Sequence, residues 1–281
     1  EKRRPGQPFF FWAGLSEPHG PYGAKNYELL ETECGFTLDD VSLPPTMEDT
    51  IENRRTRANF LYEIWYADRH LGRMLAALEA IGELENTLVV VTSDNGTSGI
   101  PQSKATPYDL GVHEPLAMMW PKRMASGRTV DDFVSFADFA PTFLEAAGIK
   151  PPAGMTGRSL LPLLASEKSG RIEADRSFVV TGLEWHGEFD PESRSGRAIR
   201  DDNYAYVVWY GNVDTDGKPL SNQQAVIPTR IEFYDMVNDP WQQHDLAKDP
   251  EYSKQKERLA KKLREVGRQT GDPRVTGEMD I

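Results

Sequence analysis

Two oxygen-bearing side chains, Asp94 and Asn95, follow directly on a strand-like run of valines. The run TLVVV spans residues 87–91 and continues into TSDNG. Ligands gather at the carboxyl ends of strands in parallel α/β sheets, and a carboxylate beside an amide oxygen suits a hard cation such as Ca²⁺ or Mg²⁺. The tripeptide Asp-Asn-Gly is also good turn chemistry without any ligand. On these residues alone, a metal site and an Asx turn both stay open.

Two further side chains could act on an anionic group. His19 follows another apolar run, in SEPHGPY, where flanking prolines and glycines would fix it for proton transfer or anion contact. Lys104 lies ten residues beyond Asp94, in a stretch rich in Gly, Pro and Ser, where it could bind an anionic ester group near a cation. A surface-loop histidine is the alternative for His19, and a single lysine in a loop such as Lys104 is usually just solvated.

The composition limits the class of protein. The chain has 281 residues, of which 38% are hydrophobic and 27% charged, as in ordinary globular proteins. A formal net charge of -12 argues against non-specific nucleic-acid binding, although a pocket for an anionic substrate can be locally basic. No apolar run is long enough to span a bilayer, and no signal peptide is visible. The chain begins without Met, almost directly in an apolar run, so we expect the natural N-terminus upstream of Glu1.

Strand and helix patterns alternate in the first part of the chain, which predicts an α/β architecture. The strand candidates share short apolar runs, and 87–94 is of the type buried on both faces of a parallel sheet; they are 8–22, 87–94 and 113–121. The helix candidates have apolar residues at three- and four-residue steps; they are 53–82 and 133–147. Residues 24–52 have little periodicity, and we expect them to be mostly loop.

The pattern changes after about residue 170. Three strand-like runs follow without a helical pattern between them, at 177–182, 203–211 and 230–236, and they predict a small antiparallel sheet. A charged helix over roughly 251–269 would close the chain. We therefore expect a larger α/β part over residues 1–170 and a small α+β subdomain over residues 171–281.

Taken in order, the motifs resemble those of the formylglycine-dependent sulfatases of the alkaline-phosphatase superfamily. After the Pro-His loop come a long helix with Asp68 and Gly72, the strand ending in TSDNG, and Lys104. The later motifs are YDLGVHEPL, ADFAPTFLEAAGI, GRSLLPLL, RAIRDDNYAYV and EFYDMVNDPWQQHDLAKDP. The resemblance runs from about Pro8 to the final helix. Within it, PQSKATPYDLGVHEPL is most similar to the glycan N-sulfatase, or sulfamidase-like, branch.

The resemblance implies a mostly parallel sheet flanked by helices, followed by a small antiparallel sheet with a closing helix. It implies that Asp94 and Asn95 help to hold a divalent cation, usually Ca²⁺, with Mg²⁺ as the alternative. His19 would contact the sulfate or steer protons at the nucleophile, and Lys104 would bind a sulfate oxygen or the bridging oxygen. Fixed cations there would stabilise the charge that sulfate transfer builds.

Two histidines are further candidates for contact with the substrate. His113 occupies a position that varies among such sulfatases, and His186 lies in the loop LEWHGEF, from which the second subdomain could reach the pocket. For His186, a loop histidine without a role is the alternative.

The nucleophile motif of such sulfatases, Cys/Ser-x-Pro-x-Arg, is absent from this sequence. The single cysteine, Cys34, sits in TECGFTL without the required Pro and Arg. The aspartate pair that completes the metal site is also absent, because Asp39-Asp40 comes after the His19 loop and not upstream of it. These absences lie on the N-terminal side and indicate truncation. We therefore expect a missing N-terminal part of the same protein as a partner, and no sulfatase activity from this chain alone.

The resemblance implies hydrolysis of a sulfate ester or sulfamate, with a sulfated carbohydrate as the favoured substrate. A formylglycine upstream of this chain would attack the sulfur, the alcohol or amine would leave, and sulfate would be released. Two alternatives stay open: a phosphodiesterase or phosphonate monoester hydrolase on the same scaffold, and a non-catalytic protein that kept the fold. Such enzymes are often exported, so we expect a periplasmic, secreted or lysosomal protein.

Overall fold

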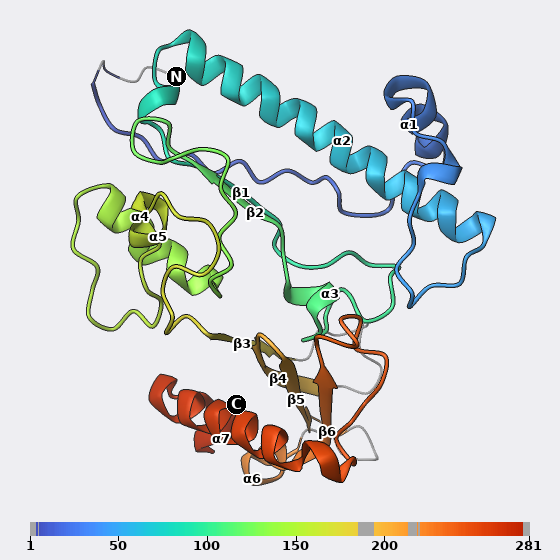
Figure 1. The fold of residues 1–281 in the computed structure, drawn as a ribbon. Helices are drawn as coiled ribbons and strands as arrows, with labels where there is room; N and C mark the ends of the chain where they lie inside the picture. The colour runs from blue at the N-terminus through green and yellow to red at the C-terminus, as the bar shows by residue number, and fades with distance from the viewer. Residues whose placement is uncertain (1–3, 5, 185–193, 213–217, 219, 278–281) are drawn as a thin grey trace. The chain divides into compact units, whose positions relative to one another are not determined.

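The computed structural model describes residues 4, 6–184, 194–212, 218 and 220–277. They form a mixed α/β structure that divides into two compact units (Figure 1). Unit 1 comprises Glu1–Leu43 and Met47–Ala77, and unit 2 comprises Pro44–Thr46 and Leu78–Ile281. This division falls elsewhere than residue 170, and the predicted boundary between residues 1–170 and 171–281 stays a prediction. No helix in the described ranges is both long and apolar enough to cross a membrane.

Unit 1 is built on two helices, α1 (Asn26–Cys34) and most of α2 (Ile51–Ala80). α2 confirms the helix expected over 53–82, whereas α1 corrects the expectation that 24–52 is mostly loop. α1 shows little periodicity because it buries only Asn26 and Leu30, and side chains of α2 hold it in place. The Asn26 amide donates to Glu63 at 2.5 Å, and the Tyr27 N–H donates to the Asn59 side chain at 2.8 Å.

The N-terminal apolar run does not form the expected strand. Residues 8–15 have no regular secondary structure, and Phe10, Phe11 and Trp12 are exposed. A strand needs a neighbouring strand to complete its hydrogen bonds, and neither sheet of the described chain includes this segment. Apolar composition alone predicted burial here, and the prediction was wrong.

Unit 2 begins with a two-stranded sheet of β1 (Val89–Thr92) and β2 (Leu116–Met119). Both strands were expected, and both are shorter than the apolar runs that predicted them. They pair antiparallel, with Val89 opposite Met119 and Thr92 opposite Leu116. The expectation that residues 87–94 are buried on both faces of a parallel sheet was therefore wrong for the described residues: β1 has one antiparallel neighbour there, and Val91 is 39% exposed. The short helix α3 (Asp109–Val112) lies between the two strands in sequence.

The helix expected over 133–147 is a 3-10 turn (Phe136–Asp138) continued by α4 (Phe139–Ala146), and α5 (Leu161–Ala165) follows. Asp138 links the two motifs ADFAPTF and GRSLL. Its carboxylate accepts from the Arg158 N–H at 2.7 Å and from the buried Arg176 guanidinium at 2.8 Å. A Cβ at Gly157 would lie 1.9 Å from the Ala137 carbonyl oxygen, so only glycine allows this approach.

The C-terminal sheet has four antiparallel strands in the order β3 (Phe178–Leu183), β4 (Arg194–Asp201), β5 (Tyr204–Gly211) and β6 (Pro228–Asp235). The small antiparallel sheet and three of its strands were expected. β4 was not, because RSGRAIRD has too few apolar residues to predict a strand. Asp202 and Asn203 join β4 to β5.

Helix α7 (Ser253–Thr270) confirms the expected closing helix and covers one face of the C-terminal sheet (Figure 1). Ile199, Val208 and Phe233 of the sheet pack there with Leu259 and Leu263 of the helix. Val207, Trp209 and Tyr234 form a second core on the opposite face, together with Tyr108 from the loop before α3. The short helices α6 (Asn222–Ala225) and α8 (Pro273–Thr276) complete unit 2. The second core is the link between the sheet and the candidate site.

Candidate functional site

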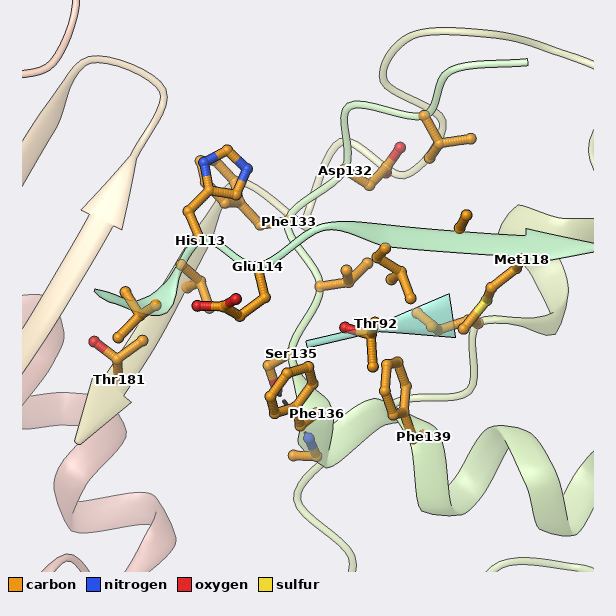
Figure 2. A pocket seen from close by; sticks show the side chains of 18 of the residues that line it. Thr92, His113, Glu114, Met118, Asp132, Phe133, Ser135, Phe136, Phe139 and Thr181 are labelled. Carbon is orange, nitrogen blue, oxygen red and sulfur yellow. Dashed lines mark hydrogen bonds between the residues drawn. The ribbon is translucent and has the colours of Figure 1, made fainter. Parts of the chain in front are cut away.

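A cavity of about 1490 Å³ lies in unit 2, between the β1–β2 pair and strand β3. Asp94, Asn95, Lys104 and His113 all line it. The structure thus brings together four of the six residues that the sequence proposed for a site. Figure 2 shows His113 and Glu114 at one end of the cavity, and Met118 and Phe139 at the other.

Asp94 and Asn95 lie in the turn that follows β1. The Asn95 amide nitrogen donates to the Gly96 carbonyl oxygen at 3.0 Å, and the Ser93 hydroxyl donates to the Asn95 carbonyl at 3.2 Å. These bonds fix the turn and occupy the amide nitrogen of Asn95, which leaves its side-chain oxygen as the atom suited to a cation. Asp94 is exposed at the cavity and Asn95 is half-buried.

The loop that carries Lys104 packs directly against this turn. The Gly96 N–H donates to the Gly111 carbonyl at 3.1 Å, and the Lys104 N–H donates to the Thr97 carbonyl at 3.3 Å. A Cβ on Gly96 would lie 2.1 Å from the Leu110 carbonyl oxygen, so the glycine permits the close approach. Lys104 itself is half-buried at the cavity wall. The amine of Lys104 and the side-chain oxygens of Asp94 and Asn95 therefore line one cavity. The backbone segments that carry them are in direct contact.

His113 follows α3 and is largely exposed, with its side chain 78% accessible. Its Nδ1 lies 3.8 Å from the Asp109 carboxylate. This exposure suits contact with a ligand that enters the cavity.

Glu114 also faces the cavity, and reasoning from sequence missed it. Burial raises the pKa of Glu114; a hydrogen bond with Ser93 lowers it in part, and the nearby charge of Asp94 raises it further. Glu114 directly follows the candidate His113 and precedes a predicted strand, and this position could have marked it as a site residue.

The cavity has an aromatic wall as well. Phe133, Phe136 and Phe139 line it together with Thr181 of β3 (Figure 2). The Arg200 guanidinium lies 5.4 Å from the ring centre of Phe133, within the range of a cation–π contact. An apolar wall beside polar groups is usual for a pocket that binds a small molecule or sugar. The sequence did not single out these residues, because aromatic side chains before a helix are more often core.

The described residues that line the cavity belong to unit 2, and they include neither of the other two predicted residues. His19 belongs to unit 1, where it is exposed and its Nδ1 lies 2.6 Å from the Gly20 carbonyl oxygen. His186 lies outside the described residues. Cys34 is half-buried in unit 1, and burial raises the pKa of its thiol, with the charge of Glu33 adding to the effect. A raised pKa disfavours the thiolate that a nucleophile requires.

The donor set fits part of a site for a hard divalent cation. Asp94 and Asn95 offer the oxygen ligands that Ca²⁺ and Mg²⁺ prefer. Such ions take six or more ligands, and within the described ranges no group of three or more His, Cys, Asp or Glu side chains is placed to hold a metal. Asp94 and Asn95 have the oxygen atoms that such a cation binds. Two ligands are too few, so a complete site requires further ligands.

Comparison with protein families gives two matches. A sulfatase family model matches residues 1–149, and a model described as N-sulphoglucosamine sulphohydrolase, C-terminal, matches residues 103–269. Each match covers more than half of the chain.

Curated proteins similar to this chain are sulfatases as well. An ulvan-active sulfatase of Formosa agariphila is 28% identical over 92% of this chain and 51% of its own length. An N-acetylglucosamine-6-O-sulfatase of Bacteroides thetaiotaomicron is 30% identical over 76% of this chain and 36% of its own. The chain thus spans about half, or less, of the length of these curated relatives.

Solved structures have the same fold. A protein in complex with its substrate D-glucosamine-2-N,6-O-disulfate matches 90% of this chain and 47% of its own, with a TM-score of 0.67 and 25% identity. A phosphonate monoester hydrolase of Silicibacter pomeroyi matches 90% of this chain and 50% of its own, with a TM-score of 0.62. At 22% identity, the second likeness concerns the fold alone.

Proposed function

The chain belongs to the sulfatase family, and from this premise we propose that it forms the cation-binding and leaving-group side of a sulfatase active site. The observation that carries the proposal is the meeting of Asp94, Asn95 and Lys104 at one cavity. Sulfate transfer builds negative charge on the peripheral and leaving oxygens, and positive groups fixed near them lower the barrier. Lys104 is itself such a positive group, and Asp94 and Asn95 are suited to hold a cation there.

Each residue has a distinct role in this proposal. Lys104 binds a sulfate oxygen or the bridging oxygen and stabilises the leaving group. Asp94 and Asn95 hold a divalent cation, Ca²⁺ in the first instance, which when bound supplies Lewis-acid polarisation of the sulfate. His113 contacts the substrate at the exposed end of the cavity. His19, in unit 1, contacts the sulfate or moves a proton at the nucleophile.

The remaining parts of the site come from outside this sequence. We assign the nucleophile to a formylglycine in a part of the same protein that precedes this chain, and the missing metal ligands to the same part. In support, the Cys/Ser-x-Pro-x-Arg motif is absent from the sequence, and only two suitable oxygen donors stand in the turn after β1. It follows that this chain alone does not hydrolyse sulfate esters.

The proposed substrate is a sulfated carbohydrate. The names of two similar proteins support this class: one is an N-acetylglucosamine-6-O-sulfatase, and the other was solved with D-glucosamine-2-N,6-O-disulfate. The match of residues 103–269 to an N-sulphoglucosamine sulphohydrolase region supports the sulfamidase-like branch, and hence attack on an N-sulfate. We propose that the enzyme is exported, as periplasmic, secreted or lysosomal, because sulfated glycans are extracellular or lysosomal polymers.

Phosphoryl transfer is the second candidate function, because a phosphonate monoester hydrolase has the same fold. The two reactions are separated by assaying the full-length protein with glucosamine N- and 6-O-sulfates and with a phosphonate monoester. We expect release of sulfate from at least one sugar at a higher kcat/KM than turnover of the phosphonate. Preference for the phosphonate would reject the sulfatase proposal, and turnover of neither would favour a non-catalytic protein.

The source of the nucleophile is tested by peptide mapping with denaturing mass spectrometry. We expect the natural protein to contain a peptide upstream of Glu1 with Cys/Ser-x-Pro-x-Arg, in which the first residue is formylglycine. A natural polypeptide that begins at Glu1, with no second chain, would contradict this assignment.

A further inference from the structure

Two glutamines with positive φ are joined by a hydrogen bond next to the candidate site. Gln102 and Gln242 have φ of 61° and 54°, in the left-handed region that non-glycine residues rarely adopt. The Gln102 side chain donates from Nε2 to the Gln242 carbonyl oxygen at 3.2 Å. Ala105, directly after Lys104, has φ of 60°. Such conformations persist only where the surroundings impose them, and they gather at functional sites.

Gln242 contacts both ends of the loop that carries Lys104. Its backbone carbonyl accepts from Gln102 at one end, and its side-chain Oε1 accepts from the Asp109 N–H at 2.8 Å at the other. Asp109 is the first residue of α3, whose preceding residue Tyr108 provides no side-chain cap. Gln242 thus supplies the acceptor that the first turn of this helix otherwise lacks. It is 2% exposed, so water does not readily replace it.

The C-terminal sheet reinforces the same end of the loop. The Tyr108 hydroxyl donates to the fully buried Glu232 carboxylate at 2.8 Å, and Arg200 Nε donates to the Asp109 carboxylate at 2.9 Å. These contacts fix residues 108 and 109 only. Gln242 differs from them because it also contacts Gln102, on the other side of Lys104.

We propose that Gln242 is a positioning residue for the site, holding loop 102–109 so that Lys104 stays at the cavity beside the Asp94–Asn95 turn. Gln242 contributes no atom to the cavity wall and acts through the loop. The expected effect of Gln242 on the catalytic rate rests on the proposed function. Its expected effect on the stability of loop 102–109 is independent of that function.

Hydrogen exchange in the full-length protein tests the effect on the loop. Gln242→Met, at similar size, removes the side-chain acceptor for the Asp109 N–H and keeps the backbone carbonyl that accepts from Gln102. Gln242→Glu keeps a side-chain acceptor, and Gln243→Met changes an exposed neighbour as the control. We expect peptides covering 97–113 to exchange about ten-fold faster in Gln242→Met, with β5 unchanged, because one buried hydrogen bond is lost. Gln243→Met should behave like the wild type, and Gln242→Glu should exchange more slowly than Gln242→Met, because it keeps the acceptor although burial of its carboxylate carries a cost. Unchanged exchange in Gln242→Met, or equal acceleration in β5, would overturn the proposal.

Sulfate release by the same variants tests the catalytic consequence. We expect Gln242→Met to lower kcat about ten-fold with a smaller change in KM, and Gln242→Glu to restore part of the rate. Normal kcat in Gln242→Met despite faster loop exchange would overturn the positioning role. If the wild type releases no sulfate, the proposed function fails, and the exchange experiment alone decides whether Gln242 holds the loop.

Discussion

Gly96 and Gly111 meet backbone to backbone, with the Gly96 N–H donating to the Gly111 carbonyl oxygen at 3.1 Å. A Cβ on Gly111 would lie 2.4 Å from the Ser103 carbonyl oxygen, just as one on Gly96 would collide with Leu110. This contact joins the turn that carries Asp94 and Asn95 to α3, which directly follows the loop that carries Lys104. The relative placement of the proposed cation ligands and the proposed sulfate-binding amine therefore depends on two residues that have no side chain.

Gly96→Ala should separate the turn from the loop. We expect a loss of about 1–3 kcal/mol in the free energy of unfolding, because the added methyl group overpacks a backbone contact. Chemical denaturation measures it, with Gly154→Ala as the control because a Cβ there meets nothing within 4 Å. Equal stability of the two variants would contradict the tight contact.

Asp94→Ala should remove the response of the full-length protein to Ca²⁺. In the wild type we expect Ca²⁺ to raise the melting temperature and a chelator to lower it, because an ion that binds only the folded state stabilises it. Asp131→Ala removes another exposed carboxylate that lines the same cavity, and it should keep the response. A full Ca²⁺ response in Asp94→Ala would show that this carboxylate is not a ligand.

Arg176 and Asp138 form a buried ion pair that should stabilise unit 2 far more than an exposed pair nearby. Their side chains are 3% and 9% exposed and 2.8 Å apart. Arg176→Met leaves a buried carboxylate without its partner, and we expect a loss of about 3–5 kcal/mol. Arg158→Met breaks an exposed pair with Asp175 and should cost much less, because water screens that pair. Denaturation that finds similar losses in both variants would contradict this assignment.

Glu184 should stabilise the fold at neutral pH and lose that effect in acid. Burial alone would raise its pKa, but hydrogen bonds from Arg274, Ser195 and Arg197 outweigh burial and lower it to about 2 from 4.5. A depressed pKa in the folded state stabilises it above the unfolded value, and the effect is lost as the pH falls toward 2.

We therefore expect Glu184→Gln to lower the melting temperature at pH 7, with the difference from the wild type shrinking between pH 4.5 and 2. Glu145→Gln, at an exposed position of α4, should have little effect at any pH. A difference between Glu184→Gln and the wild type that does not depend on pH would be incompatible with the depressed pKa.

The sequence pattern predicted correctly those strands and helices whose own apolar residues are enough to bury them. The run NYAYVVWYG contains β5, which is buried along nearly its whole length. RSGRAIRD did not predict β4, because it has few apolar residues and because Arg197, a charged residue, is buried through an ion pair with Asp272 at 2.7 Å. The run PFFFWAGL was as apolar as β5, yet it forms no strand, because strand formation depends on a neighbour that the run itself cannot specify.

Sequence motifs could propose only some of the residues that line the candidate site. The sequence proposed Asp94, Asn95, Lys104 and His113 from their types and from the resemblance of their motifs. All four line the cavity, and their roles stay a prediction. Glu114 and the aromatic wall carried no distinctive spacing. Gln242 lies 133 residues from Asp109 in sequence, and only the fold brings its side chain to that N–H.

Sulfate release by the full-length protein tests the central claim most directly, with Lys104→Met compared with Lys122→Met. Lys122 is exposed and does not line the cavity. If Lys104 stabilises the charge on the transferring sulfate, its loss should lower kcat about 100-fold or more on a glucosamine sulfate, and Lys122→Met should match the wild type. Wild-type kcat and KM in Lys104→Met would contradict the proposed site.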